Sequence, residues 1–390
     1  MPLSPRLPLA FRQLIDSPAK TTAAVAGICF SNVLVFFQLG LLSAIYQSQE
    51  RPYSLLDGEI VLVSSRFSRL SQTPTIWKSD VMRAQGVKGV DRVSSLLVGL
   101  GTVLILPEGY TTNAQIYAID PSNPSLAPYK VRLNFHAINL FERAAIDNLS
   151  RPSYVKSVDA VLKTNHEYQT NLGDKRLLIN TTASVGSTFA SDLSLVMSQE
   201  NFLHYFPGRS SDLVNIGVVK LKKGYSIDRV LYTLNQKLYP KGYSIQAYSI
   251  PQLSALELDY WRTHTSLTFI FGLGVVVGFV VSGIILYQIL SSDVLSHISE
   301  YATLLALGYT NTYVTRVVFT QALLLTLLAF PVAISISIAL YSVMSVATNL
   351  VIYMTLGRAV YVLILGSATS MFSCYLATDK LRKVDPSTLY

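Results

Sequence analysis

Residues 265–292 have the sequence TSLTFIFGLGVVVGFVVSGIILYQILSS, which contains no aspartate, glutamate, lysine or arginine. A helix needs about 20 apolar residues to cross the hydrocarbon core of a bilayer, so this stretch predicts a membrane span. Three more uncharged runs occupy Thr21–Gln49, Val317–Gly357 and Ala359–Thr378. Only 14% of all residues are charged, whereas a soluble domain has about 25%. The chain is therefore predicted to be a multi-pass membrane protein.

The first uncharged run has an alternative interpretation as a cleaved signal peptide. The apolar part of a signal peptide has about 7–15 residues and ends at a small-residue cleavage site. Here the apolar stretch Ala23–Tyr46 is far longer, and Ser43-Ala44-Ile45 matches such a site poorly. We therefore expect an uncleaved membrane anchor.

The third run, Val317–Gly357, is long enough to raise the question of two helices. A division around Ser342–Asn349 would leave only Leu350–Gly357, which is too short to span. We therefore expect one helix, with a kink at Pro331. The predicted order is a cytoplasmic segment 1–20, a span 21–47, an extracytoplasmic domain 48–264, a span 265–290, a cytoplasmic loop 291–316, a span 317–341, an outer connection 342–358, a span 359–378 and a cytoplasmic tail 379–390.

The orientation follows from basic residues near the ends of the spans, which favour the cytoplasmic side. Arg6, Arg12 and Lys20 precede the first span, and Lys380, Arg382 and Lys383 follow the last. Both chain ends are therefore predicted to be cytoplasmic, as four spans require.

The net charge of +8 is not concentrated, because the segment from 50 to 264 holds 23 of the 31 basic residues beside 18 acidic ones. We expect no nucleic-acid partner.

The large polar segment has the pattern of a divided α+β domain. Strands are predicted at Glu59–Ser65, Asp212–Leu221 and Tyr243–Ser249, one or two strands at Val87–Ile105, and helices at Ser79–Gln85 and Ser226–Leu238. The order is β-α-β, an insertion at about 107–207, and a second β-α-β. The predicted fold is an α-helical membrane protein with four transmembrane helices plus an α+β extracytoplasmic domain, split ferredoxin-like with an insertion.

The sequence contains no recognisable catalytic motif. No phosphate-binding G-x-x-x-x-G-K-[ST] loop occurs, and the segment from Gly86 to Gly89 is better interpreted as a turn. The five histidines are dispersed without metal-ligand spacing. No ionisable residue lies deep inside a predicted span, which disfavours a transporter driven by an ion gradient. We expect no enzyme activity and no cofactor, so energy for any transport must come from another protein.

Small residues recur at four-residue spacing in two of the spans, where they allow helices to approach closely. Ala23, Gly27 and Ser31 share one face of the first span. Gly274, Gly278 and Ser282 share one face of the second. The spacing is compatible with packing inside one chain and with a dimer seam, and the residues alone leave both open.

The loop between the second and third spans contains a predicted helix. Ser291-Ser-Asp293 supplies residues that favour a helix start, and Val294–Leu307 then runs to Gly308, which is expected to stop the helix. This helix carries Glu300 and several apolar residues. It suits docking into the groove of a partner, but a helical hairpin lying at the membrane interface fits the residues equally well.

A resemblance favours the first interpretation. The segment Ser299-Glu-Tyr-Ala-Thr-Leu-Leu-Ala-Leu-Gly-Tyr309 resembles the coupling-helix region of FtsX/MacB-type permeases, which also share the order of spans. The tail Lys383-Val-Asp-Pro-Ser387 resembles the Asp-Pro ending of that family. Glu300, Tyr301, Leu304 and Gly308 match the helix that contacts the ATPase, although Leu305 stands where relatives often carry a basic residue.

The chain most resembles DevC-type membrane subunits of cyanobacterial DevBCA exporters. The stretches concerned are Pro8-Leu-Ala-Phe-Arg-Gln-Leu14, Phe36-Phe-Gln-Leu-Gly40, Ala118-Ile-Asp-Pro-Ser-Asn-Pro124, Gly278-Phe-Val-Val and Tyr287-Gln-Ile-Leu290. The resemblance implies a homodimeric inner-membrane permease with a periplasmic domain. It also implies a separate DevA-like ATPase that binds ATP, a DevB-like membrane-fusion protein and a TolC-like duct. The implied activity is export of a lipid-like or other hydrophobic substrate. An FtsX-like regulator of a periplasmic enzyme, without transport, is the alternative.

Overall fold

The computed structural model describes residues 9–106, 109–165, 167–186, 188–189, 191–348 and 350–382, with the backbone alone at residues 305 and 379–382. The chain forms two compact units. The helical unit comprises residues 1–43, 267–343 and 352–390, and the α/β domain comprises residues 44–266 and 344–351. Several residues named above lie outside the described residues or side chains: Arg6, Pro8, Leu305, Lys380, Arg382 and the tail from Lys383 to Ser387.

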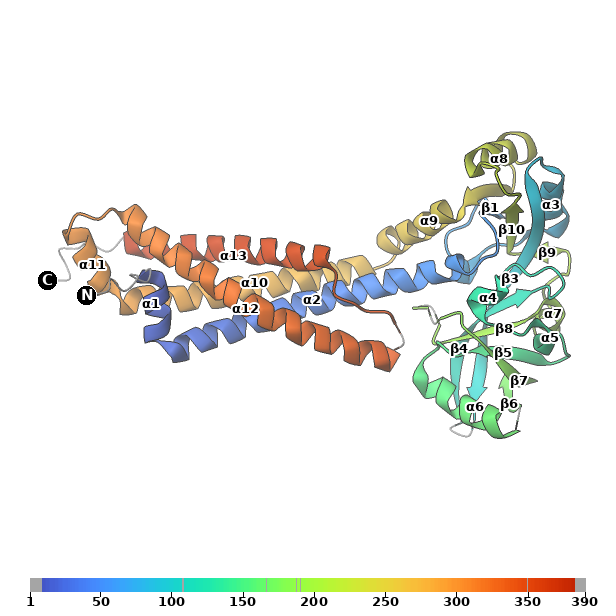
Figure 1. The fold of residues 1–390 in the computed structure, drawn as a ribbon, viewed down its shortest axis with the longest axis horizontal. Helices are drawn as coiled ribbons and strands as arrows, with labels where there is room; N and C mark the ends of the chain where they lie inside the picture. The colour runs from blue at the N-terminus through green and yellow to red at the C-terminus, as the bar shows by residue number, and fades with distance from the viewer. Residues whose placement is uncertain are drawn as a thin grey trace. The chain divides into compact units, whose positions relative to one another are not determined.

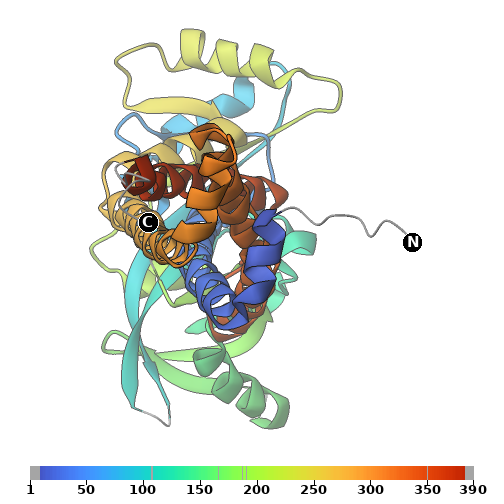
Figure 2. The ribbon, with the colours of Figure 1, turned by 90° about the vertical axis from the view of Figure 1, so that its left-hand side faces the viewer.

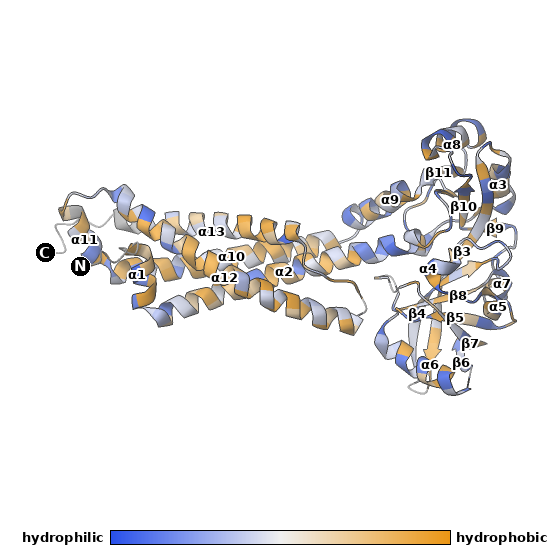
Figure 3. Cartoon of the chain, viewed as in Figure 1, coloured by the Kyte–Doolittle hydropathy of each residue, from blue (hydrophilic) through white to orange (hydrophobic). Residues whose placement is uncertain are grey.

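The helical unit is built around four long apolar helices. Its elements are α1 (Leu9–Asp16), α2 (Pro18–Ser54), α10 (Leu267–Ser296), α11 (Ile298–Ala306), α12 (Asn311–Thr348) and α13 (Leu356–Arg382). In the described part of the chain α2, α10, α12 and α13 are the helices long and apolar enough to cross a membrane. Apolar residues extend along most of their length (Figure 3). The helical half of the predicted fold class is confirmed.

Helix α12 extends beyond the predicted third span at both ends. It begins at Asn311 and continues through Pro331 to Thr348. The seven residues after Tyr341 contain no glycine or proline, so nothing in them ends the helix before Thr348. One turn after Pro331, the Ser335 hydroxyl donates a hydrogen bond to the Pro331 carbonyl at 2.9 Å. The connection to α13 is correspondingly shorter than expected.

The α/β domain contains a mixed sheet with helices on it (Figure 1). Its strands are β1 (Ile60–Ser64), β2 (Ile76–Trp77), β3 (Val90–Ile105), β4 (Tyr110–Ile119), β5 (Arg143–Asp147), β6 (Tyr168–Leu172), β7 (Lys175–Ala183), β8 (Leu193–Ser198), β9 (Leu213–Val214), β10 (Ile216–Leu221) and β11 (Ile245–Ser249). Its helices are α3 (Lys78–Met82), α4 (Pro128–Val131), α5 (Phe135–Ile138), α6 (Pro152–Asn165), α7 (Gln199–Tyr205), α8 (Ile227–Thr233) and α9 (Ile250–Thr263). Among the described residues the main sheet has the order β11-β1-β10-β3-β4-β8-β5-β7-β6.

The first four strands of that order form the predicted divided ferredoxin-like unit. Strand β1 pairs antiparallel with both β10 and β11, and β10 pairs antiparallel with β3. The two β-α-β halves, β1-α3-β3 and β10-α8-β11, therefore interleave in one sheet. This part of the fold prediction is confirmed.

One predicted strand and one predicted helix in this unit are divided. The expected strand Asp212–Leu221 is two strands, β9 and β10, separated by Asn215. The Asn215 side chain accepts a hydrogen bond from the Val98 amide at 2.8 Å and donates to the Thr73 carbonyl at 2.7 Å. These bonds fix the chain between β9, which pairs with β2, and β10, which pairs with β1 and β3. The helix expected at Ser226–Leu238 continues after α8 as a π-helical turn over Leu234–Leu238.

Strand β3 joins the ferredoxin-like unit to the insertion, which explains its 16-residue length. Its first half, Val90–Leu96, pairs with β10, and its second half, Leu96–Ile105, pairs with β4. The insertion then continues the same sheet through parallel β4–β8 and β5–β7 pairs. Two clusters of buried apolar side chains, which share no residue, form the core of the domain.

Among the described residues of the insertion, Asp147 has the most deeply buried carboxyl group. Its oxygens accept hydrogen bonds from the backbone amides of Val185 at 2.7 Å, Gly186 at 3.0 Å and Leu149 at 3.2 Å. The Ser150 hydroxyl donates a fourth bond at 2.9 Å. Burial raises the pKa of Asp147, and these four donors oppose that rise. The carboxyl group thus holds the β7–β8 connection against the end of β5.

Candidate functional site

The coupling segment, residues 293–313, connects α10, α11 and α12 at one end of the helical unit (Figure 2 looks onto this end). Helix α11 ends at Ala306, and Gly308 has a φ of +90°. The Tyr309 amide donates to the Leu304 carbonyl at 3.1 Å. A glycine with positive φ and a bond from the following amide to the carbonyl five residues earlier form a Schellman-type termination of a helix. The predicted helix stop at Gly308 is therefore present.

The prediction that this helix starts at Ser291–Asp293 is wrong. Ser291 and Asp293 lie inside the last turns of α10, which runs without a break to Ser296. Helix α11 begins after His297, although backbone bonds from His297 to Asp293 and from Tyr301 to His297 continue the helical pattern. His297 is therefore the junction between the two helices. The triplet Ser291-Ser-Asp293 did not reveal this helix boundary. Serine and aspartate also occur inside helices when their side chains find hydrogen-bond partners there.

The four residues expected to contact an ATPase fall into two groups. Glu300 and Gly308 are exposed and Leu304 is half-buried. Tyr301 has 1% of its surface exposed and faces inward. Burial raises the pKa of Tyr301 to about 12, so its hydroxyl stays protonated and donates to Gln13 Oε1 at 3.2 Å. Glu300 and Leu304 thus remain available to a partner, whereas Tyr301 supports α11 from inside.

An exposed apolar patch adjoins the end of α11. It consists of Leu307, Tyr309 and Tyr313, of which Leu307 is 71% exposed and Tyr309 is 48% exposed. The two tyrosine rings lie 4.9 Å apart. Sequence reasoning named none of these residues as site residues, although the cluster of large side chains around Gly308 was a visible signal. Tyrosine is enriched among the residues that contribute most to protein interfaces, so the patch extends the candidate docking surface.

A buried polar pair lies between α10 and α12. Gln321 Nε2 donates to Asp293 Oδ2 at 2.6 Å, and both side chains are buried. His297 Nδ1 lies 3.5 Å from Asp293 Oδ1. Polar side chains that bond across apolar helices hold a defined packing between them. The two residues are 28 positions apart, and the sequence had no local signal for their pairing.

The small-residue faces of the first two spans meet each other. A Cβ on Gly278 would lie 2.7 Å from Val35 Cγ2 of α2, and one on Gly274 would lie 2.7 Å from Gln38 Cδ. A Cβ on Gly27 would lie 2.8 Å from Ile285 Cγ2 of α10, and Ser282 is buried on the same helix. Each of the three glycines therefore faces a side chain of the other helix within the same chain.

Gly278→Leu should destabilise the helical unit, because the new side chain has no room beside Val35. Overpacking of this kind costs about 1–3 kcal/mol. The expected result is a lower yield of monodisperse protein and earlier aggregation in size-exclusion chromatography after stepwise heating. Gly272→Leu on the same helix is the matched control, since a Cβ there meets nothing within 4 Å. Equal behaviour of the two variants would contradict close α2–α10 packing.

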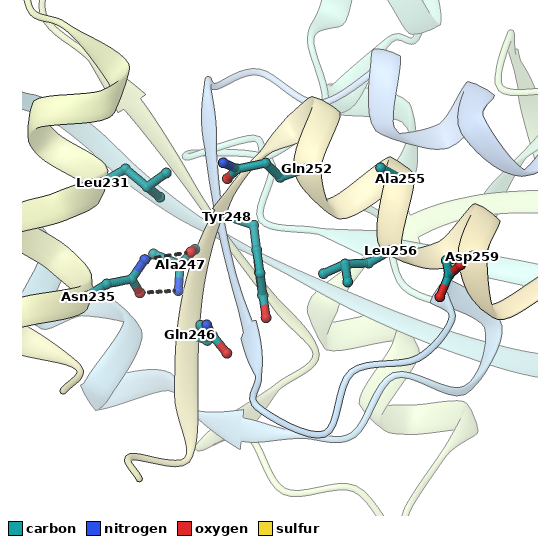
Figure 4. A pocket seen from close by; sticks show the side chains of 9 residues that line it. All are labelled: Leu231, Asn235, Gln246, Ala247, Tyr248, Gln252, Ala255, Leu256 and Asp259. Atoms are coloured by element: carbon teal, nitrogen blue, oxygen red, sulfur yellow. Dashed lines mark hydrogen bonds between the residues drawn. The ribbon is translucent and has the colours of Figure 1, made fainter. Parts of the chain in front are cut away.

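The α/β domain has a groove of about 530 Å³ beside the edge strand β11, between α8 and α9 (Figure 4). The Asn235 side chain donates to the Ala247 carbonyl and accepts from the Ala247 amide, both at 2.9 Å. The Asn235 side chain therefore pairs with the free edge of β11 at Ala247, which protects this edge from pairing with another strand.

In the described part of the chain no cluster of three metal-ligating side chains occurs.

Comparison with known proteins gives one family match. Residues 271–386 match the family FtsX-like permease C-terminal. No curated protein matches the chain. The periplasmic region of MacB from Actinobacillus actinomycetemcomitans is similar with a TM-score of 0.35 and 11% identity, over 54% of this chain and 96% of that one. The extracellular domain of the noncanonic ABC-type transporter YknZ from Gram-positive bacteria gives 0.34 and 13%, over 49% and 98%.

The matched segment begins within α10 and includes the coupling segment and α12. Its position is the one expected from the resemblance of the sequence around Glu300. In the described part of the chain the order is one long apolar helix, a large α/β domain and three further long apolar helices. Residues 271–386 are thus similar to the C-terminal domain of FtsX-like permeases.

Proposed function

We propose that this chain is the permease subunit of an ATP-driven ABC exporter. The supporting observation is the family match over residues 271–386. This segment includes α11, which carries the exposed Glu300 and adjoins the apolar patch of Leu307, Tyr309 and Tyr313. An ATPase on a separate chain binds this surface and supplies the energy. The four helices cross the inner membrane with both chain ends in the cytoplasm and the α/β domain in the periplasm.

Three further protein partners and the chemical class of the exported substrate are part of this proposal. A second copy completes a homodimer in the bilayer, a DevB-like membrane-fusion protein binds the periplasmic domain, and a TolC-like protein continues the path. Helix movements driven by the DevA-like ATPase reach the periplasmic domain and expel a lipid-like or other hydrophobic substrate. The sequence resemblance to DevC-type subunits is the support for these finer assignments, and ATP is bound by the partner alone.

Affinity purification from native membranes with mass spectrometry tests this proposal. Recovery of an ABC ATPase together with a membrane-fusion protein is the expected result. Recovery of an ATPase with a periplasmic hydrolase in place of the fusion protein would favour the FtsX-like regulator. Absence of any ATPase would overturn both functions.

A further inference from the structure

The N-terminal helix α1 is bound to the coupling helix α11 through one buried side chain. Gln13 of α1 is 3% exposed. Its Oε1 accepts a hydrogen bond from the Tyr301 hydroxyl at 3.2 Å, and its Nε2 donates to Glu300 Oε2 at 3.5 Å. Ala10 and Leu14, on the same face of α1, are also buried. One carboxamide therefore contacts two consecutive residues of α11.

The C-terminal end of α1 is bonded to the first membrane helix. A single residue, Ser17, separates α1 from α2. The Thr21 hydroxyl of α2 donates to the Leu14 carbonyl at 2.7 Å, and the Thr21 amide donates to the Ser17 carbonyl at 3.0 Å. Lys20 also donates to Ser296 Oγ at 3.3 Å. The short connection and its bonds limit independent movement of α1 and α2.

These contacts give α11 a third mechanical connection. Along the chain α11 is joined only to α10 and α12. The Gln13 contacts add a path from α11 to α2 besides the one through α10, against which α2 packs at Gly274 and Gly278. A buried hydrogen bond between two polar side chains is directional and costly to break, because both groups would lose their partners away from water. When α11 is displaced, α1 therefore either resists the movement or moves with it.

We propose that α1 is a clamp on the coupling helix and that Gln13 is the positioning residue that passes movement of α11 to the first membrane helix. This inference rests on the proposed function, since it assumes that an ATPase moves α11. Gln13 acts through Tyr301 and Glu300. In this arrangement one docking event moves α2, α10 and α12 together.

The test follows each membrane helix separately in the full chain, purified with its ATPase and placed in nanodiscs. The two native cysteines, Cys29 and Cys374, are first replaced by serine. A spin label is then attached through Phe30→Cys on α2 or Ile284→Cys on α10, both at exposed positions. The measurement is the change in label mobility when a non-hydrolysable ATP analogue is added.

In the otherwise unchanged chain, both labels should respond. In Gln13→Leu the response on α2 should fall about five-fold or more, within the usual range of coupling between sites, while the response on α10 persists. Tyr301→Phe keeps the buried ring, removes the hydroxyl and should give the same selective loss. Gln288→Leu, an exposed glutamine of α10, is the control and should leave both responses intact.

A full response on α2 in both Gln13→Leu and Tyr301→Phe would overturn the clamp while leaving the proposed function in place. Equal loss on both helices would also overturn it, since Gln13 would then only stabilise the fold. Failure of the unchanged chain to retain an ATPase would overturn the proposed function and this inference with it.

Discussion

The double substitution Glu300→Arg and Leu304→Asp should remove the ATPase from the purified complex. Glu300 is exposed and Leu304 half-buried on α11, so the first change reverses a charge and the second places a carboxylate at an apolar contact. A central interface residue typically contributes about 2 kcal/mol or more, which corresponds to a roughly 30-fold loss of affinity. Quantitative mass spectrometry of native-membrane purifications measures this as the ratio of ATPase to permease.

Glu200→Arg with Leu203→Asp is the matched control. These residues also lie on one helix, α7, where Glu200 is exposed and Leu203 half-buried. The same chemical changes in the α/β domain should leave ATPase recovery unchanged. The membrane-fusion protein should remain with the α11 variant, because the helix lies in the other unit of the chain. Wild-type recovery of the ATPase by the α11 variant would contradict docking at Glu300 and Leu304.

Asp147→Ala should produce the largest loss of stability in the α/β domain. The substitution leaves the buried amides of Val185 and Gly186 without their acceptor. Each buried donor left unsatisfied costs about 1–3 kcal/mol, so the free energy of unfolding should fall by about 2–6 kcal/mol. For a domain of this size the midpoint of thermal unfolding should fall by roughly 5–20 °C.

Tryptophan fluorescence is a suitable measurement for this variant. Both tryptophans, Trp77 and Trp261, belong to the α/β domain, so their emission follows that unit. Asp91→Ala, at an exposed aspartate of β3, controls for loss of one negative charge and should shift the midpoint little. Equal midpoints for the two variants would show that Asp147 does not hold the β7–β8 connection.

The parts of the fold that the sequence predicts depend on local signals. The charge-free stretch of residues 265–292 needs no tertiary contact to indicate a membrane helix. Alternation and amphipathic spacing likewise located β1, β10 and α8 within a few residues. Their arrangement followed because two β-α-β units have few ways to interleave in one sheet. The order of the insertion strands, with parallel β4–β8 pairing, had no such constraint.

The candidate site was predicted only in part, because its buried contacts join distant residues. Glu300, Leu304 and Gly308 lie in one short segment whose pattern is visible in the sequence. The inward position of Tyr301 depends on Gln13, which is 288 residues away. The Asp293–Gln321 pair similarly depends on how α10 and α12 pack. Glycine spacing identified a close-packing face on α10, and the structure was needed to show that α2 occupies it.

The most direct test of the account is the rate of ATP hydrolysis by the co-purified ATPase in lipid nanodiscs, with and without this chain. The wild-type chain should raise the rate several-fold, and the Glu300→Arg, Leu304→Asp variant should not. The comparison requires equal amounts of ATPase and of folded permease. An unchanged rate in the presence of wild-type chain would contradict the central claim that this permease is driven by a separate ATPase.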